Sequence, residues 1–266
     1  GSLPETPGRD TDAIIAAAAA GELDALVVAG VELDDLPDPD AAREALARVP
    51  FVLSLELRAS DVTDRADVVL PVAAVAEKSG TFVNWEGRHR PFGDALKVPG
   101  ALSDLRVLSA IANAMDVHLG LPDAAGAYDE LLELGVWVGD RPAGPSVRPA
   151  EPVSPAPGQA LLSTWRQLLG TGRMEDGEPY LAGTARQPRA YLSKATADEV
   201  GVPDGGSLRV TGERGSVTVP VVVTDIADRV VWLPANAHGC DIRRDLGGTA
   251  GQTVILAAPT TNGRQQ

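Results

Sequence analysis

The order of apolar and polar positions divides the chain into two halves of different character. In the first half, the stretch TDAIIAAAAAGELDALVVAG predicts a helix, a break at Gly21 and then a short buried strand. The stretch DPDAAREALARVP predicts a second helix between Pro39 and Pro50, and the runs FVLSLEL and ADVVLP predict two more strands. Strands without polar alternation, separated by helices, are typical of a parallel sheet covered on both faces. The first half is therefore predicted to be α/β.

A chemically unusual loop follows the third predicted strand. Residues 77–91, EKSGTFVNWEGRHRP, combine glycines, an Asn, two aromatic side chains and a Lys/Arg/His cluster, although the whole chain has only 3 Phe, 4 Trp and 3 His. In open α/β sheets, ligands bind outside the carboxyl ends of the strands. The loop is therefore a candidate binding site, and the stretches SDLRVLSAIANAMD and AYDELLEL after it predict two helices.

The second half begins with a proline-rich stretch and becomes rich in strands. Residues 139–158 have no apolar periodicity, which predicts a linker or an extended strap, and ALLSTWRQLLG after it predicts a helix. The stretch SLRVTGERGSVTVPVVVTD alternates apolar and polar residues about a Gly-Glu-Arg-Gly turn, and VVWLP and TVILAAP supply further strands. A short helix in SKATADEVGVPDGG is expected to end near Gly201. These patterns predict a smaller β-rich barrel domain at residues 159–266, after an α/β domain at residues 1–138.

Composition narrows the possible functions. The chain has 37 acidic and 23 basic residues, a formal net charge of −14, which argues against nucleic-acid binding through phosphate contacts. The single cysteine, Cys240, forms no internal disulfide and supplies none of the cysteine motifs that bind iron–sulfur clusters. No window approaches the length of a membrane-spanning helix. The opening Gly-Ser without Met suggests a cloning remnant and a chain that is a fragment.

Two long stretches resemble one known family. ADVVLPVAAVAEKSGTFVNWEGRHRPF, followed by PGALSDLRVLSAIANAMD, resembles a motif of the molybdopterin oxidoreductase superfamily. KATADEVGVPDGGSLRVTGERGSVTVPVVVTDIADRVVWLP resembles the molybdopterin-dinucleotide-binding domain that ends proteins of this superfamily. The resemblance implies a partial, Rossmann-like parallel-sheet domain followed by a double-psi barrel. Within the superfamily the chain is similar to the family of large peripheral-arm subunits (the G subunits) of bacterial proton-pumping NADH:quinone oxidoreductases (respiratory complex I), and its Ala/Asp/Arg/Val-rich usage suggests an actinobacterial member.

This resemblance implies a structural part rather than a catalytic one. In that family the amino-terminal part carries iron–sulfur clusters, and the carboxy-terminal part keeps the molybdoenzyme fold, in general without the molybdenum cofactor. The chain would then be a cofactor-free carboxy-terminal fragment with no catalytic residues, packed against other subunits of the peripheral arm. We expect no nucleic-acid partner, no direct membrane insertion, and a cytoplasmic location, peripheral on the inner face of the cell membrane.

The resemblance also marks candidate cofactor-binding positions. In cofactor-bearing relatives the loop lies where the dinucleotide binds, and the matching positions are Gly80, Thr81, Asn84, Glu86, Gly87 and Arg88. In the loosely similar stretch ANAHGCDIRRDLGGTAGQ, the candidates are Asn236, His238 and Arg243. Glycines let backbone N–H groups approach a phosphate, and Arg binds phosphate through two hydrogen bonds. The competing interpretation is that these residues brace a loop, with Arg88 paired to Glu77 or Glu86 and Trp85 packed on the barrel.

The remaining patterns predict ordinary structural roles. His238 and Cys240 are too few donors for a metal site, so no metal ligands are assigned. Residues 247–251 predict a turn before the last strand, Asp67 a cap or strand-edge residue, and the acidic run from Glu32 to Asp40 a solvated loop and helix start.

Two alternatives to the structural role stay open. The chain could be a fragment of a molybdenum oxidoreductase such as a formate dehydrogenase, and molybdopterin guanine dinucleotide would then be its cofactor. It could also be a free-standing nucleotide-binding module.

Overall fold

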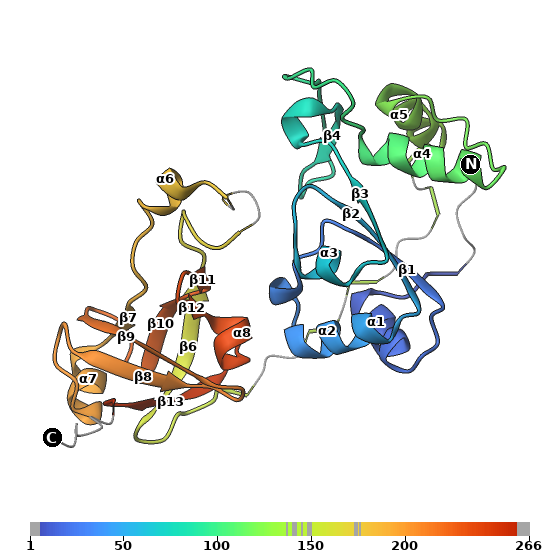
Figure 1. The fold of residues 1–266 in the computed structure, drawn as a ribbon. Helices are drawn as coiled ribbons and strands as arrows, with labels where there is room; N and C mark the ends of the chain where they lie inside the picture. The colour runs from blue at the N-terminus through green and yellow to red at the C-terminus, as the bar shows by residue number, and fades with distance from the viewer. Residues whose placement is uncertain are drawn as a thin grey trace, which may run out of the picture. The chain divides into compact units, whose positions relative to one another are not determined.

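A computed structural model of the chain describes residues 6–136, 138–139, 143–144, 146–147, 151–172, 175 and 177–259. The chain divides into two compact units, one of residues 1–33 and 41–146 and the other of residues 34–40 and 147–266. The first unit has mixed α/β structure, and the second contains a closed barrel (Figure 1).

The helices and strands are, in order, α1 (Thr11–Ala19), β1 (Ala25–Ala29), η1 (Leu33–Asp35), α2 (Pro39–Arg48), β2 (Phe51–Glu56), α3 (Asp61–Arg65), β3 (Val68–Pro71), η2 (Val75–Glu77), β4 (Gly80–Val83), β5 (His89–Phe92), α4 (Asp104–Ala114), α5 (Ala124–Glu133), β6 (Gln159–Trp165), α6 (Pro179–Ala182), β7 (Ala190–Leu192), α7 (Lys194–Val200), β8 (Ser207–Thr211), β9 (Ser216–Val223), β10 (Val230–Pro234), β11 (Asn236–Ala237), β12 (Cys240–Asp241), α8 (Ile242–Leu246) and β13 (Thr253–Ala257).

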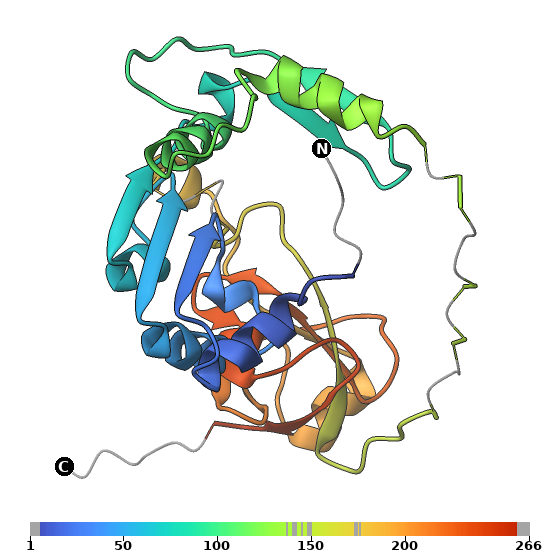
Figure 2. The same cartoon turned by 90° about the vertical axis from the view of Figure 1, so that its right-hand side faces the viewer.

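The first unit is built on a parallel sheet of three strands in the order β1-β2-β3 (Figure 2). The strands and helices that the apolar runs predict are present, and Gly21 ends the first helical segment with a φ of 73°. Helix α4 covers part of the sheet, because Val107 packs with Leu53 and Leu55 in one buried cluster. Side chains at the carboxyl ends of the strands therefore depend on this small core for their positions.

The outer strands of this sheet are not buried, contrary to the sequence-based prediction. Val27 of β1 is 58% exposed and Val69 of β3 is 41% exposed, whereas β2 is buried at every position after Phe51. The prediction was wrong because a continuous apolar run does not reveal which strand lies at an edge. In the described chain β1 and β3 are the two edge strands.

The second unit contains a closed barrel with the strand order β10-β6-β13-β8-β9-β7 (Figure 1). Alternating positions of β8, β9 and β13 point into one hydrophobic core, as the alternating sequence predicts. The short helix α7 ends at Gly201, whose φ of 70° is the left-handed conformation that favours glycine. The predicted short helix and hairpin are thereby confirmed.

One predicted helix of the second unit is a strand. The stretch ALLSTWRQLLG was expected to be helical, but β6 occupies Gln159–Trp165, with Ala160 and Leu162 buried. Strand β6 pairs with β10 in parallel and with β13 in antiparallel orientation. The pairing with strands about 70 to 90 positions away along the chain outweighs the local helical pattern, as is common for short apolar runs.

The proline-rich stretch at 139–158 lies partly outside the described residues. Its described end, residues 151–158, has no helix or strand and contacts the barrel: the carbonyl of Pro155 accepts a hydrogen bond from Arg229, and the N–H of Gly158 donates to Glu199. None of the helices in the part of the chain that the structure describes has the length and apolar character needed to cross a membrane.

Candidate functional site

The unusual loop forms a β-hairpin. Strands β4 and β5 pair antiparallel from Gly80 opposite Phe92 to Val83 opposite His89. The rings of Phe82 and Phe92 stack with their centroids 4.7 Å apart. Helix α5 lies along the hairpin (Figure 2), where the hydroxyl of Tyr128 is 3.0 Å from Nδ1 of His89. The motif is therefore a braced structural element of the first unit.

The side chain of Asn84 organises the turn of this hairpin. Its Oδ1 accepts hydrogen bonds from the N–H of Glu86 at 3.1 Å and from the N–H of Arg88 at 2.8 Å. The N–H of Gly87 donates to the carbonyl of Asn84, and Gly87 has a φ of 76° that other residues rarely adopt. An Asn that bonds to the backbone ahead of it is a common turn device. Asn84 thus has a complete structural explanation without a ligand.

The charge of Arg88 is also paired within the hairpin. Its Nε lies 2.8 Å from a carboxylate oxygen of Glu86, as the bracing interpretation predicts. Glu77 instead accepts a hydrogen bond from the N–H of Ala74. Trp85 is 93% exposed, with no packing partner in the hairpin, and its packing on the barrel stays a prediction. A residue at the tip of a two-stranded hairpin has few neighbours to pack against.

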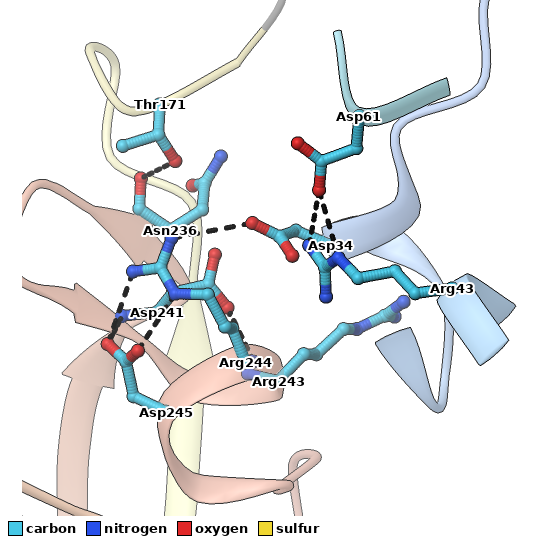
Figure 3. A network of polar contacts seen from close by, with 9 residues as sticks. All are labelled: Asp34, Arg43, Asp61, Thr171, Asn236, Asp241, Arg243, Arg244 and Asp245. Atoms are coloured by element: carbon cyan, nitrogen blue, oxygen red, sulfur yellow. Dashed lines mark hydrogen bonds and ion pairs between the residues drawn. The ribbon is translucent and has the colours of Figure 1, made fainter. Parts of the chain in front are cut away.

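Asn236 and Arg243 line one pocket of the barrel unit. The pocket has a volume of about 630 Å³ and is lined by Asp34, Asp35, Thr164, Trp165, Arg166, Ala235, Asn236, Asp241, Ile242, Arg243, Thr249 and Ala250. The carbonyl of Asn236 accepts hydrogen bonds from the N–H and hydroxyl of Thr171 (Figure 3). A Cβ at Gly170 would lie 2.5 Å from that carbonyl, so the loop after β6 needs glycine here.

Short helix α8 positions the charged groups beside this pocket. Asp241 caps the helix by accepting hydrogen bonds from the N–H groups of Arg243 and Arg244 at 3.0 Å. Asp245 accepts from the N–H of Asp241 and from Nε of Arg244, and Arg244 also lies 3.4 Å from Asp34 (Figure 3). Arg244, Asp34 and Asp245 thus form one ionic network.

Burial and pairing shift the pKa values in this network. Burial raises the pKa of the Asp241 carboxyl. Burial also acts to raise the pKa of Asp245, but the hydrogen bonds from Arg244 and from the Asp241 N–H outweigh it and hold that pKa below its usual value. The hydrogen bond to Asp245 in turn raises the pKa of the Arg244 guanidinium. Arg244 and Asp245 are therefore bound to each other as an ion pair.

The third candidate of the barrel unit lies elsewhere. His238 lines a second pocket of about 360 Å³ with the loop Gly170–Gly172 and helix α6. The nine candidate positions therefore fall into three places: the hairpin of the first unit, the Asn236 and Arg243 pocket, and the His238 pocket.

Carboxylates beside these residues oppose the binding of an anionic dinucleotide. The diphosphate of such a cofactor needs free N–H donors and positive charge. The pocket of Asn236 and Arg243 presents Asp34, Asp35 and Asp241 beside its arginines. In the hairpin, the side-chain oxygen of Asn84 and Nε of Arg88 already have partners in the turn.

Sequence reasoning missed two features of the structure. The run from Glu32 to Asp40 was expected to be solvated, but Asp34 and Asp38 form ion pairs with Arg244 and Arg214. No local signal reveals this, because the partners lie far away along the chain. Glu56 was also missed: it ends the buried strand β2, is 4% exposed, and its Oε2 has no hydrogen-bond partner within the described ranges.

The structural roles expected for Asp67 and for residues 247–251 agree with the structure. Asp67 is a strand-edge residue whose carboxylate accepts a hydrogen bond from the N–H of Val52. Residues 247–251 form the turn that leads into β13. Across the described ranges there is no group of three or more His, Cys, Asp or Glu residues that could hold a metal ion. Cys240 is buried, which raises the pKa of its thiol to about 12.

Comparison with known proteins identifies the class. A family of molybdopterin oxidoreductases matches residues 2–114, and the molybdopterin dinucleotide binding domain matches residues 161–263. The chain belongs to the molybdopterin oxidoreductase superfamily. The solved structure of acetylene hydratase from Pelobacter acetylenicus shares the fold, with a TM-score of 0.58, 16% identity, and coverage of 86% of this chain and 39% of that one.

Particular relatives are much more similar in sequence. The NADH-quinone oxidoreductase G subunit of Mycobacterium tuberculosis is 51% identical over 96% of this chain and 32% of the relative. The corresponding G subunit of Streptomyces coelicolor is 52% identical over 97% of this chain and 31% of the relative. A nitrate reductase of Klebsiella oxytoca is 35% identical over 84% of this chain and 32% of the relative. The chain thus spans about a third of the length of these relatives.

Proposed function

We propose that the chain is the carboxy-terminal, cofactor-free structural part of the G subunit of a proton-pumping NADH:quinone oxidoreductase. The observation that carries this proposal is the identity of 51–52% with actinobacterial G subunits, which extends over nearly the whole chain. Identity at this level across both units favours a shared role over a shared fold alone. Other subunits of the peripheral arm are then its partners, and iron–sulfur clusters belong to the amino-terminal part of the same polypeptide.

The arrangement of charges supports the cofactor-free part of this proposal. Arg88 is paired with Glu86, and the pocket of Asn236 and Arg243 contains the carboxylates of Asp34 and Asp241. An anionic dinucleotide would have to displace these groups or lie against them, at an electrostatic cost. Electron transfer belongs to the assembly, and this part contributes packing surface on the cytoplasmic side, peripheral to the inner face of the membrane.

The proposal includes a finer description of the fold. The first unit is the partial, Rossmann-like part of the molybdoenzyme fold, and the barrel has double-psi topology. Its two parallel pairs, β6 with β10 and β7 with β9, among otherwise antiparallel pairs support that topology. The domains are residues 1–138 and 159–266, joined by the linker 139–158.

A chimera tests the proposed role. The corresponding third of the mycobacterial G subunit would be replaced by this chain in a mycobacterial host, and membranes would be assayed for NADH:quinone reductase activity and for the size of the complex on native gels. We expect the chimera to assemble and to be active. A matched chimera with Leu233→Asp, at a position with 0% exposure in the barrel core, should fail to assemble. If the first chimera folds but stays outside the complex, the proposal is wrong.

One alternative role has a specific observation in its favour. The identity of 35% with a nitrate reductase and the match to the dinucleotide-binding domain favour a fragment of a molybdenum oxidoreductase, a class that includes formate dehydrogenases. Detection of molybdopterin guanine dinucleotide bound to the purified chain would favour this role. A free-standing nucleotide-binding module is the third possibility, and binding of guanine nucleotides without a pterin would favour it.

A further inference from the structure

An acidic segment from the first half of the sequence belongs with the barrel. Residues 34–40 lie between two stretches of the first unit, yet they group with the second. Asp38 is 2.5 Å from Arg214, Asp34 is 3.4 Å from Arg244, and the carbonyl of Asp35 accepts a hydrogen bond from Arg243. We refer to Asp34–Asp40 as the acidic segment.

The three arginines that contact this segment come from two connected elements. Arg243 and Arg244 lie on helix α8 (Figure 3), and Arg214 lies in the turn between β8 and β9. The N–H of Arg214 donates to the carbonyl of Leu246 at 3.1 Å, and a Cβ at Gly247 would lie 2.6 Å from Cγ of Arg214. The turn is therefore fixed against the end of α8, so the arginines are held on one supported surface.

The charges of the two sides match. The acidic segment offers carboxylates at Asp34 and Asp38 and a backbone carbonyl at Asp35, and each meets an arginine. The side chains of Asp34 and Arg214 are each 28% exposed, and those of Arg244 and Asp38 are 43% and 51% exposed. Single pairs this exposed contribute little, so the segment depends on several contacts together.

We propose that Arg214, Arg243 and Arg244 form a binding site for an acidic peptide, and that the chain's own acidic segment occupies it. The carboxylates of Asp34 and Asp38 and the carbonyl of Asp35 occupy the places that an anionic ligand would need at Arg244, Arg214 and Arg243. The acidic segment therefore competes with anionic ligands for these three arginines of the barrel unit. This inference stands on contacts within the barrel unit and does not rest on membership in a respiratory complex.

Titration with inorganic pyrophosphate tests the competition. The probe would be added to the full chain, to the double variant Asp34→Asn/Asp38→Asn and to the control Asp24→Asn, with binding measured by calorimetry. Asp24 lies outside the acidic segment, and its change removes a carboxylate of the first unit. We expect the double variant to bind pyrophosphate at least about tenfold more tightly than the unaltered chain, and the control to match the unaltered chain.

A second arm tests whether the site recognises an acidic peptide. The synthetic peptide ELDDLPDPD should displace pyrophosphate from the double variant, and the same peptide with Asn at the positions of Asp34 and Asp38 should not. Adding Arg243→Gln to the double variant should abolish pyrophosphate binding, with folding checked by circular dichroism. If the double variant does not fold, the single variants Asp34→Asn and Asp38→Asn replace it, each with a smaller expected gain.

Three results would overturn the inference. The first is equal binding of pyrophosphate by the unaltered chain and the folded variants. The second is no binding by any of them. The third is failure of the acidic peptide to compete where pyrophosphate does bind.

Discussion

The carboxylate of Glu86 accepts a hydrogen bond from Nε of Arg88 at 2.8 Å, across a turn whose backbone is fixed by Asn84. In the sequence, these residues are the strongest candidates for phosphate recognition. In the structure, they satisfy one another. Contacts within the hairpin therefore stabilise it without a bound cofactor. These contacts predict how variants of the hairpin should behave.

Removing the side chain of Asn84 should weaken the hairpin. Asn84→Ala eliminates the acceptor for the N–H groups of Glu86 and Arg88, so we expect a loss of about 1 kcal/mol in the free energy of unfolding. Urea denaturation measures this change. The control Asn84→Asp keeps an acceptor oxygen at the same place and should lose less. Equal losses in the two variants would show that the turn does not depend on this acceptor.

The contact between Glu199 and Gly158 should make stability depend on pH. The hydrogen bond from the N–H of Gly158, and then that from Arg229, hold the pKa of Glu199 below its usual 4.5. A lowered carboxyl pKa stabilises the fold above the unfolded value of 4.5, and this contribution is lost as the pH falls through the lower folded value. Glu199→Gln should therefore be less stable than the unaltered chain at neutral pH, and the difference should shrink in acid.

Unfolding by urea between neutral and acidic pH measures this dependence. Asp198→Asn on the same helix is the control, because it removes the exposed pair with Lys194 and leaves the contact of Glu199 with Gly158 in place. A difference between Glu199→Gln and the unaltered chain that stays constant with pH would contradict the assignment.

The thiol of Cys240 should be unreactive toward alkylating reagents in the folded protein. Its thiol is buried, burial raises the pKa to about 12, and the reactive thiolate is then almost absent near neutral pH. We expect iodoacetamide to label the native chain far more slowly than the same chain in urea, as measured by mass spectrometry. Comparable labelling rates in the two states would mean that the barrel opens around β12 much more readily than its packing suggests.

Gly212 should be intolerant of a side chain. A Cβ there would lie 2.3 Å from the carbonyl oxygen of Leu246, at the end of α8. Gly212→Ala should cost about 1–3 kcal/mol in the free energy of unfolding, because the backbone must move. Gly172→Ala, where no atom lies within 4 Å of the added Cβ, is the matched control. A neutral effect of Gly212→Ala would show that the turn and α8 are not held together.

Local pattern predicted much of the fold, and long-range pairing decided the rest. The alternation around the Gly-Glu-Arg-Gly turn correctly predicts β8 and β9, because both strands and their turn lie within one short stretch. Strand β6 was missed because its partners, β10 and β13, are far away along the chain. The same limit applies to the candidate site. The pairing of Arg88 with Glu86 is local and was predicted, but that of Asp34 with Arg244 spans 210 positions and was not.

The central claim, a molybdoenzyme fold that holds no cofactor, is tested most directly by elemental analysis for molybdenum and tungsten together with pterin fluorescence. The protein would come from a host that makes the cofactor, with Arg88→Ala purified in parallel. We predict that the folded chain and the variant both contain neither metal nor pterin. Metal and pterin near one per chain, lost in the variant, would contradict the claim and make the hairpin from Gly80 to Phe92 part of a working cofactor site.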